Sequence, residues 1–271
     1  MSADHSVVAE RLDNGVLLIT LDSPRTRNAL SGAMAAELSR LLSVADLDDA
    51  TRVVVLTGAP PAFCSGADLS RGSSVFAPAS DGFSACPLDP TPSRIRKPVI
   101  AAVNGHAIGI GLTITLHCDL RVMALDAKYG VVQVRRGAMP DAFSHWTLPR
   151  LVGLGAASDI LLTGRIFDGH EALRVGLATR AVPADEVLRV ALELADDIAV
   201  NTSPVSVALT KRLLWRSFES DRRTVGDAET EGHRHLFARP DAREGVDAFL
   251  ESRRPNWTSS IPADWPDDLT T

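Results

Sequence analysis

The sequence predicts an α/β fold that ends in a helical segment. Short apolar runs, typical of buried strands, alternate with helix-like segments over roughly the first two-thirds of the 271 residues. From about Pro183 onward only helix-like segments follow. Strands that alternate with helices are typical of a sheet covered by helices. We therefore expect a core over residues 1–200 and a separate C-terminal helical region over residues 201–271.

The predicted strands are short runs of apolar and β-branched residues that are bounded by turn signals. The first is entered through the turn Asp13-Asn14-Gly15, and the second is broken by Gly58-Ala59-Pro60-Pro61. The run Val99-Ile100-Ala101-Ala102-Val103 has no polar interruption, so we expect it to be buried on both faces. We predict strands over residues 16–21, 52–57, 99–103, 120–124 and 129–134.

The predicted helices follow from apolar periodicity and from capping residues. Ser31 is a candidate N-cap, and Ser203-Pro204 is an N-cap followed by proline at the first turn. We predict helices over residues 31–44, 140–150, 154–162, 170–175, 185–200, 203–218, 222–237 and 240–252, and a helix start within 112–116. Residues 253–271 are expected to be irregular. Residues 71–92 are expected to form either a mobile loop over a pocket or a disordered insertion without a role.

The stretch from Lys97 to Asp119 organises the chain. After the buried strand, Asn104-Gly105 turns the backbone, and Gly109-Ile110-Gly111 leads into a helix. The first turn of a helix has amide N–H groups without internal partners, so it suits an anion or an oxygen that is gaining charge. Glycines at such a turn also serve packing alone, and a GxG motif by itself does not separate the two interpretations.

The charge and the cysteine content give no indication of a nucleic-acid-binding, membrane-surface, disulfide-rich or metal-binding protein. The net charge of −6 is spread along the chain, which does not indicate a nucleic-acid or membrane-surface partner. The three cysteines are far apart and odd in number, which suits a reducing compartment and predicts neither a disulfide framework nor a metal site. The first residues lack the pattern of a secretory signal, so we expect a cytoplasmic protein.

Several motifs in a fixed order resemble the crotonase superfamily, which includes enoyl-CoA hydratases and isomerases. The similarity covers roughly residues 7 to 257. It rests on Pro24-Arg25-Thr26-Arg27-Asn28-Ala29-Leu30, Phe63-Cys64-Ser65-Gly66-Ala67-Asp68-Leu69, the stretch from Lys97 to Asp119, Leu148-Pro149-Arg150-Leu151-Val152-Gly153 and Phe249-Leu250-Glu251-Ser252-Arg253-Arg254-Pro255. Several motifs in order are far more specific than any one of them.

The resemblance implies a crotonase-like spiral of ββα units and a C-terminal helical trimerisation region in a homotrimer or homohexamer. It also implies an acyl-CoA thioester as substrate, with coenzyme A entering as part of it and no other cofactor or metal. The thioester oxygen would be held by the N–H groups of Ala67 and Ile110. Gly66, Ala67, Asp68, Leu69, Ile110 and Gly111 would lie along the substrate, with Arg27 facing a phosphate and Arg253 as a weaker candidate from a neighbouring subunit.

The sequence departs from the family at the catalytic acids. The two glutamate positions of typical hydratases fall on Thr113 and Gln133, and neither side chain can act as a carboxylate base near neutral pH. Asp141 is the only acidic residue between Asp126 and Asp159, and its position matches one where other branches of the family place an active acid. From the residues alone, a helix N-cap is the favoured interpretation of Asp141 after Pro140, and the match to the family is what favours catalysis.

These residues predict an enoyl-CoA hydratase/isomerase-like enzyme, and favour double-bond isomerisation with Asp141 as acid and base. Alternatives are a hydratase that uses Asp141 to activate water, and a hydrolase or dehalogenase with Asp141 as nucleophile. A catalytically inactive acyl-CoA-binding protein is a further alternative, because it would also lack both glutamates. His145, four residues after Asp141, is a second candidate for catalysis, and packing or surface exposure is the plainer interpretation. Cys64 is interpreted as a packing residue, because no neighbouring base is evident to activate it.

Overall fold

The structure is a computed structural model that describes residues 6–70, 72 and 84–266. The described strands are β1 (Ser6–Arg11), β2 (Val16–Asp22), β3 (Val53–Gly58), β4 (Ala62–Cys64), β5 (Val99–Val103), β6 (His106–Ile108), β7 (Leu120–Ala124), β8 (Tyr129–Gly130) and β9 (Arg180–Val182). The described helices are α1 (Gly32–Leu47), α2 (Ile110–Thr113), α3 (Ser144–Thr163), α4 (Gly169–Arg174), α5 (Val187–Asn201), α6 (Pro204–Arg216), α7 (Arg222–Phe237), α8 (Pro240–Leu250) and α9 (Ile261–Asp264). Short 3₁₀ helices include Ile114–His117, which continues α2, and Gln133–Arg136.

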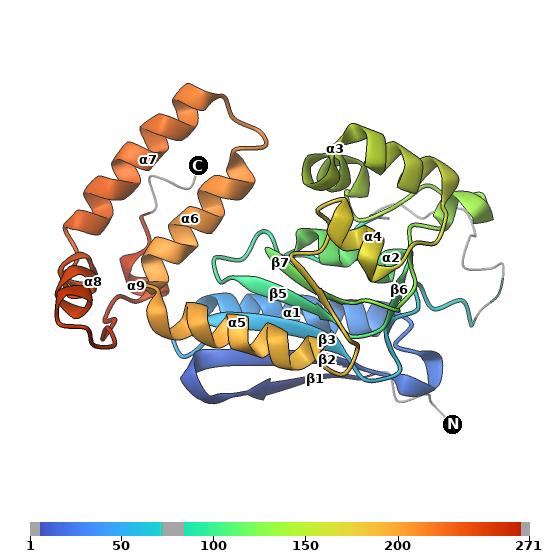
Figure 1. Cartoon of the computed structure of the whole chain (residues 1–271), viewed down its shortest axis with the longest axis horizontal. Coiled ribbons are helices and arrows are strands. Elements are labelled where there is room, and N and C mark those ends of the chain that lie inside the picture. The colour runs from blue at the N-terminus through green and yellow to red at the C-terminus, as the bar shows by residue number, and fades with distance from the viewer. Residues whose placement is uncertain (1–5, 71, 73–83, 267–271) are drawn as a thin grey trace.

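Two sheets form the core. The larger sheet has the strand order β1-β2-β3-β5-β7-β9, in which only the β1–β2 pair is antiparallel. The smaller sheet is parallel and has the order β4-β6-β8. Strands β3, β5 and β7 each pass to the next strand of the smaller sheet, so successive turns of the chain add one strand to each sheet. This arrangement is the spiral of ββ units that the resemblance implies, and the chain runs through it as Figure 1 shows.

The larger sheet is buried because its central strands carry apolar side chains on both faces. Every residue of β3 and of β5 is buried, which matches their uninterrupted apolar sequences. Helix α5 packs across β3, β5 and β7, and α1 packs against β1 and β2. The carboxyl ends of the short parallel strands β4 and β6 lead directly into the two turns that form the candidate site.

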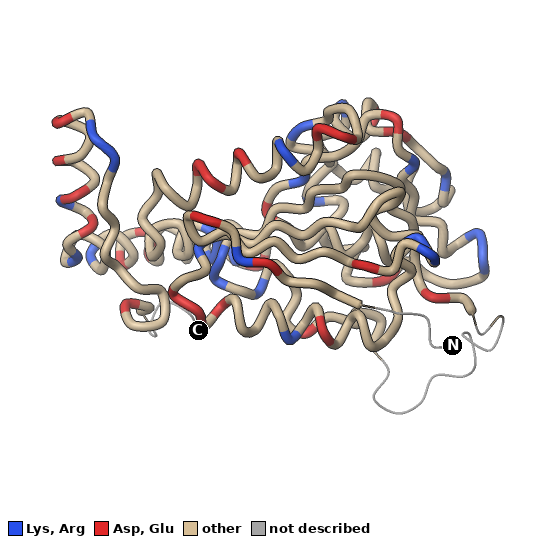
Figure 2. Tube along the Cα trace, turned by 90° about the horizontal axis from the view of Figure 1, so that it is seen from below, with Lys and Arg blue, Asp and Glu red and all other residues tan. Residues whose placement is uncertain are grey.

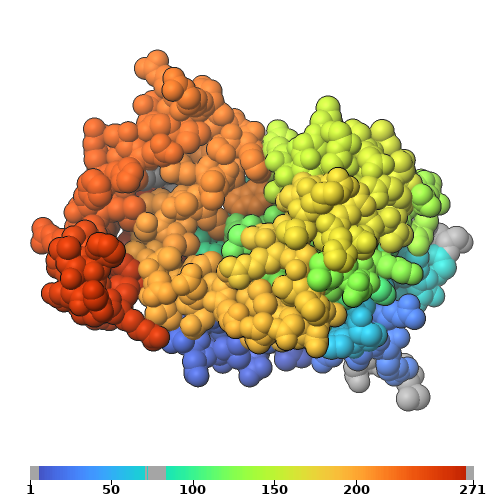
Figure 3. All heavy atoms as spheres, in the orientation of Figure 1, coloured from blue at the N-terminus to red at the C-terminus, as the bar shows by residue number. Residues whose placement is uncertain are grey.

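Helices α6, α7 and α8 form a lobe at one end of the molecule (Figures 1 and 3). The lobe is joined to the sheets by Lys211 of α6, whose ammonium group forms an ion pair with Asp119 at 2.8 Å. The same ammonium donates hydrogen bonds to the carbonyl oxygens of Pro92 and Lys97 at 2.7 and 2.8 Å. A boundary between residues 200 and 201 would fall between α5 and α6, and this division into domains stays a prediction.

Most predicted elements are confirmed. The strands at 16–21, 52–57, 99–103 and 120–124 are present as β2, β3, β5 and β7, and the helices at 31–44, 154–162, 170–175, 185–200, 203–218, 222–237 and 240–252 are present with shifts of a few residues. Ser31 caps α1 as predicted, because its side chain accepts a hydrogen bond from the Met34 N–H at 3.2 Å. Ser203 precedes α6, but its hydroxyl donates to Asp241 at 2.8 Å instead of capping the helix.

Several predictions are wrong in their boundaries. The strand predicted over 129–134 ends at Gly130, and the short helix α9 lies within the tail that was expected to be irregular. The helix start predicted within 112–116 lies earlier, at Ile110. The helix predicted from residue 140 begins at Ser144, because Ala142 and Phe143 adopt left-handed backbone conformations with φ of 45° and 53°. Of the predicted loop over 71–92, residues 71 and 73–83 lie outside the described part of the chain.

Acidic and basic positions are interspersed over the molecule (Figure 2). Within residues 6–70, 72 and 84–266, we find no helix with the length and apolar character that crossing a membrane requires.

Candidate active site

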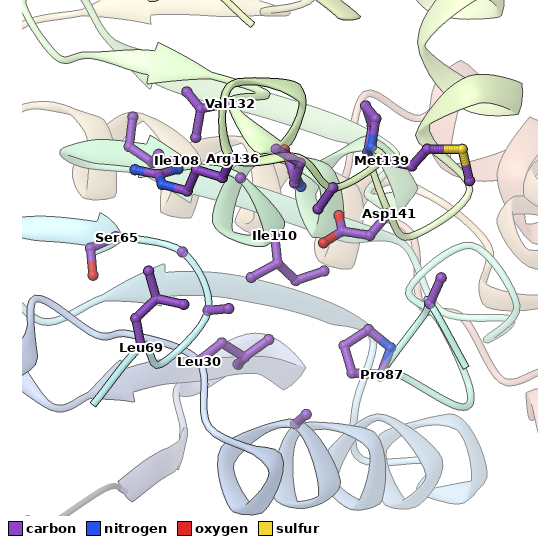
Figure 4. A pocket seen from close by; sticks show the side chains of 18 of the residues that line it. Leu30, Ser65, Leu69, Pro87, Ile108, Ile110, Val132, Arg136, Met139 and Asp141 are labelled. Atoms are coloured by element: carbon purple, nitrogen blue, oxygen red, sulfur yellow. The ribbon is translucent and has the colours of Figure 1, made fainter. Parts of the chain in front are cut away.

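A cavity of about 470 Å³ lies where the two turns after β4 and β6 face the segment that contains Asp141 (Figure 4). The residues of its wall come from separate parts of the sequence: Leu30, Ser31, Gly32, Ala35, Ser65, Gly66, Ala67, Leu69, Ser84, Ala85, Pro87, Ile108, Gly109, Ile110, Val132, Gln133, Arg136, Ala138, Met139, Pro140 and Asp141. Most of these side chains are small or apolar. The polar groups in the wall are therefore few, as is typical of a small-molecule site.

The first turn places the Ala67 N–H at the cavity. Ala67 pairs with Leu30 in an isolated parallel bridge, in which the neighbouring groups make the bonds: Leu30 N–H donates to the Gly66 carbonyl at 2.8 Å and Asp68 N–H donates to the Leu30 carbonyl at 3.1 Å. The alternation of a β bridge turns the Ala67 N–H away from Leu30. Within the described part of the chain this N–H has no backbone partner.

The second turn brings Ile110 to the same cavity. Gly109 has φ of 57° and ψ of −125°, a conformation that favours glycine, and Ile110 is the first residue of α2. An N–H group in the first turn of a helix has no intrahelical acceptor, and none is found for Ile110 among the described residues. A Cβ atom built on Gly66 would lie 3.0 Å from the Ile108 carbonyl oxygen, so the two turns are in close contact.

Asp141 reaches the same cavity, and its side chain points toward Ile110 in Figure 4. The Thr113 hydroxyl donates a hydrogen bond to Asp141 Oδ1 at 2.5 Å. Ile110 and Thr113 are the first and last residues of α2, so this single turn of helix carries one amide donor and also holds the acid. The interpretation of Asp141 as a helix N-cap is wrong, because α3 begins at Ser144 and has no side-chain cap.

Burial raises the pKa of the Asp141 carboxyl above its ordinary value. The hydrogen bond from Thr113 acts against this rise, because it stabilises the charged form, and Gln133 and the charge of His145 act in the same direction as Thr113. A carboxyl group with a raised pKa in an apolar cavity is a stronger base than an exposed one once it is ionised.

Gln133 faces the Asp141 carboxyl but does not make a hydrogen bond of normal geometry with it. Both Nε2 and Oε1 are buried without a partner in the described part of the chain. The amide group lies against Gly109, where a Cβ atom would be 3.6 Å from Nε2. Gln133 therefore places an unpaired donor and acceptor at the base of the cavity, next to Asp141 and the Ile110 turn.

The structure brings together most of the predicted site residues. Gly66, Ala67, Leu69, Ile110, Gln133 and Asp141 line the cavity. Thr113 does not line the cavity itself, but its hydroxyl group donates a hydrogen bond to Asp141, which does. Their roles toward a substrate stay predictions.

Other predicted residues lie around the cavity. Arg27 is exposed and its carbonyl oxygen accepts from the Ser65 N–H at 3.0 Å, which places its backbone beside the first turn. Asp68 lies next to that turn and its carboxylate accepts from the Ser70 N–H at 2.9 Å. Gly111 is buried behind the wall, where an added Cβ would lie 2.3 Å from the Cys64 carbonyl oxygen, so its absence of a side chain serves packing.

The remaining candidates lie outside the wall of the cavity. Arg253 forms ion pairs with Glu244 and Glu251, both at 2.6 Å, and His145 is exposed. The Cys64 thiol is buried, and burial raises its pKa to about 11, which matches a packing role. Within the described ranges, His, Cys, Asp and Glu side chains do not gather in any group of three or more that could hold a metal ion.

Sequence reasoning missed part of the wall. Arg136 is an exposed cation beside the cavity, and Met139, Ser84 and Pro87 close its other side. The signal for Arg136 was present in the Arg135-Arg136 pair that follows Gln133, but two adjacent arginines are usually a solvated surface feature.

Comparison with known proteins places the chain in a family. The family model of enoyl-CoA hydratase/isomerase matches residues 11–260. Enoyl-CoA hydratase ACTT3 of Alternaria alternata is 39% identical over 255 residues, which are 92% of this chain and 84% of that protein. Mevalonyl-coenzyme A hydratase sidH of Aspergillus fumigatus is 36% identical over 251 residues, covering 90% of this chain and 92% of that protein.

Solved structures agree with this result. The crystal structure of a probable enoyl-CoA hydratase/isomerase from Mycobacterium abscessus has a TM-score of 0.91 and 47% identity, and the match covers 94% of this chain and 99% of that one. Enoyl-CoA hydratase from Mycobacterium tuberculosis H37Rv has a TM-score of 0.85 and 31% identity over 94% of this chain and 99% of that one. The chain thus belongs to the enoyl-CoA hydratase/isomerase family of the crotonase superfamily.

Proposed function

We propose that the cavity binds an enoyl-CoA thioester and that Asp141 moves a proton between two carbons of its acyl chain. The observation that carries this proposal is the presence of Asp141 in the same wall as the Ala67 and Ile110 turns. An ionised Asp141 takes a proton from one carbon, the double bond shifts as charge reaches the thioester oxygen, and the protonated acid returns the proton to another carbon.

The two backbone N–H groups stabilise the charged intermediate. Removal of a proton leaves an enolate, whose negative charge lies largely on the thioester oxygen. Hydrogen-bond donors that are already aimed at this oxygen cost no reorganisation when the charge develops, and each such donor typically contributes about 3 kcal/mol. The N–H groups of Ala67 and Ile110 are suited to this role, because neither has a partner to give up among the residues that the structure describes.

Hydration is the second candidate, and the named relatives favour it. ACTT3 and sidH are both hydratases by name. In this case Asp141 would activate a water molecule, with the Gln133 amide as a neighbouring polar group. A hydrolase or dehalogenase with Asp141 as nucleophile, and a binding protein without catalysis, remain alternatives that the same experiment separates. Assembly into a homotrimer or homohexamer also stays a prediction.

The test is Asp141→Asn assayed with a panel of 3-enoyl-CoA and 2-enoyl-CoA thioesters. We expect turnover to fall by about 10²- to 10⁴-fold, because one general base contributes that much. Products are separated by mass: isomerisation leaves the mass of the thioester unchanged, and hydration adds one water. A covalent adduct on Asp141 would instead identify a nucleophile.

Two controls make the result interpretable. Asp126→Asn changes an exposed carboxylate away from the cavity wall and should retain full turnover. The Asp141→Asn protein should be folded, because removal of a buried carboxyl with a raised pKa removes a cost that the folded state bears at neutral pH. Unchanged turnover in Asp141→Asn would remove Asp141 from the mechanism, and tight acyl-CoA binding without turnover in the wild type would favour a binding protein.

A further inference from the structure

A second cavity, of about 540 Å³, lies between α3 and α6, separate from the acyl-CoA cavity. Helix α3 contributes Trp146 to its wall, and α6 contributes Arg212, Trp215 and Arg216; Figure 1 shows where the two helices lie. One side of its wall is polar and carries Arg94, Arg212, Arg216, Glu219, Thr91 and Ser93. The other side is aromatic. None of these residues lines the acyl-CoA cavity, so the proposed function assigns no role to them.

The polar side of the wall is rich in arginine. Three guanidinium groups share the wall with the single carboxylate of Glu219. Arg212 Nε is buried and makes no hydrogen bond within the described part of the chain. Burial lowers the pKa of Arg212, and the charges of Arg94 and Arg216 lower it further. Asp46 acts in the opposite direction, but its carboxylate already forms an ion pair with Arg96 at 2.9 Å.

The aromatic side is fixed in place. The Trp215 ring is stacked between Trp146 and His117, with both centroid distances at 6.4 Å. The Trp215 Nε1–H donates to Asp119 at 2.7 Å, and Phe143 meets His117 edge to face. The cavity therefore has one wall of mutually packed rings and one wall with three arginines.

We propose that this cavity binds a phosphate-like oxyanion, and that its occupancy is coupled to the Asp141 segment. Guanidinium groups bind phosphate oxygens through paired, charge-assisted hydrogen bonds, and the Arg212 Nε–H has no partner among the described residues. The hydroxyl groups of Thr91 and Ser93 also line the cavity, and their oxygen atoms lie 3.0 Å apart in a hydrogen bond.

A chain of hydrogen bonds connects the cavity with Asp141. His117 Nε2 lies 2.8 Å from the Ala142 carbonyl oxygen, which can only accept, so Nε2 carries the proton. Burial lowers the pKa of His117, which keeps the ring neutral near pH 7 and leaves Nδ1 as an acceptor for the Ser93 hydroxyl at 3.2 Å. If the Ser93 hydroxyl donates its proton to a bound oxyanion instead, the hydrogen bond from Ser93 to His117 is lost.

These hydrogen bonds end at a stretch of backbone with uncommon dihedral angles. Ala142 follows Asp141 directly, and both Ala142 and Phe143 have left-handed conformations that are uncommon for residues with side chains. The bond from His117 to the Ala142 carbonyl helps to hold this conformation. Loss of the bond from Ser93 to His117 would therefore affect the bond from His117 to the Ala142 carbonyl, and so the backbone directly after Asp141.

The binding test is calorimetric titration of the full chain with inorganic phosphate at pH 7.5, at constant ionic strength set with sodium chloride. We expect saturable binding in the wild type and at least tenfold weaker binding in Arg212→Gln. Arg150→Gln is the matched control, because Arg150 stacks on Trp146 without lining the cavity, and it should bind as the wild type does. Equal affinity in wild type and Arg212→Gln overturns the proposal. Absence of saturable binding overturns it too, whether the cavity stays empty or another copy of the chain fills it.

Two further titrations complete the test. Adenosine 3′,5′-bisphosphate that binds at least tenfold tighter than phosphate, and loses this affinity in Arg212→Gln, would assign the site to a nucleotide-borne phosphate. Equal affinity would assign it to the free ion.

Coupling is measured as the change in acyl-CoA affinity on saturation with phosphate, which needs no turnover. We expect at least a twofold change in the wild type that is absent in Arg212→Gln, because coupling between two binding sites is reciprocal. An unchanged affinity overturns the coupling, and failure of the isomerase assay would leave this readout intact.

Discussion

Asp141 combines burial with one strong hydrogen bond, and these two influences on its pKa oppose each other. Burial raises the pKa because the charged form loses water, and the Thr113 hydroxyl lowers it because it donates to the carboxylate. Burial is the larger influence, so the net direction is upward. The bond from Thr113 thereby fixes the position of the Asp141 carboxylate, and burial keeps its pKa above that of a surface aspartate.

This pKa predicts the pH dependence of turnover. A carboxyl base acts only when it is ionised, so kcat/KM should fall as the pH decreases through the raised pKa of Asp141. The acidic limb should therefore lie above the value of about 3.9 that an unperturbed aspartate would give. The measurement is a kcat/KM profile with a saturable acyl-CoA substrate, corrected for the stability of the protein at each pH. An acidic limb at or below the ordinary value would contradict this assignment.

The Thr113 hydroxyl gives a second prediction at this scale. Thr113→Val keeps the shape of the side chain and removes the donor to Asp141 Oδ1. The charged form of Asp141 loses stabilisation, so the acidic limb of the profile should move to higher pH, and kcat at neutral pH should fall about tenfold or more.

Thr115→Val is the matched control for Thr113→Val. Thr115 is also buried, but its hydroxyl donates to the Leu112 carbonyl oxygen at 2.7 Å and does not contact Asp141. This variant can lose stability, and its pH profile should keep the wild-type position. An equal shift in both variants would show that general destabilisation, and not the bond to Asp141, moves the limb.

Helix α2 is the element that organises the site. It is only one turn long, yet its first residue lines the cavity and the hydroxyl group of its last residue donates a hydrogen bond to Asp141. Its position is fixed by close contact with β4, because Gly111 lies against the Cys64 carbonyl oxygen and Cβ. The geometry of the site therefore depends on a glycine that does not itself line the cavity.

Gly111→Ala tests this dependence. The added Cβ would lie 2.3 Å from the Cys64 carbonyl oxygen, which is backbone and cannot swing aside. Either α2 or β4 must move, so we expect a loss of about 1–3 kcal/mol or more in the free energy of unfolding and a large loss of turnover. Gly155→Ala in α3 is the control, since nothing lies within 4 Å of that position and alanine favours the helix. Denaturant unfolding measures both, and equal stabilities would contradict the packing argument.

The strands and helices that the sequence predicts best are those with the strongest patterns. The runs that became β3 and β5 have no polar interruption, and α1 combines an N-cap with a regular apolar face. The missed strands are those without a pattern: β1 is mostly exposed, and β4, β6 and β9 have three residues each. Their pairing with neighbouring strands defines them, and such pairing is not visible in a local stretch of sequence.

The site shows the same division between local and tertiary information. Ala67, Ile110 and Asp141 could be named from motifs in order, and the structure places all three at one cavity. The local signal at Pro140-Asp141 predicted that Asp141 caps a helix. The carboxylate instead accepts a hydrogen bond from Thr113, and the helix begins at Ser144. Neither that bond nor the unpaired amide of Gln133 could be predicted, because both depend on segments that are distant in sequence.

At the scale of the whole molecule, one buried ion pair joins the C-terminal helices to the sheets. Only 4% of the Lys211 side chain is exposed, and its ammonium group has three partners: Asp119 and the carbonyl oxygens of Pro92 and Lys97. Asp119 in turn accepts from the Val99 N–H at 2.7 Å and from Trp215 of α6 at 2.7 Å. This network fixes the start of β5, and therefore the strand that leads to the Ile110 turn, relative to α6.

Lys211→Met tests how strongly the two parts are joined. The methionine fills a similar volume but leaves the half-buried Asp119 without its cation; breaking a fully buried pair on one side typically costs about 3–5 kcal/mol, and we expect a loss at or below the low end of that range because Asp119 keeps its bonds to Val99 and Trp215. We expect a lower denaturation midpoint and earlier proteolytic cleavage between α5 and α6, because the lobe loses its main polar attachment. Lys128→Met is the control, since Lys128 is exposed, and its midpoint should stay within about 0.5 kcal/mol of the wild type. Equal stability of the two variants would mean that apolar contacts alone hold the C-terminal helices against the sheets.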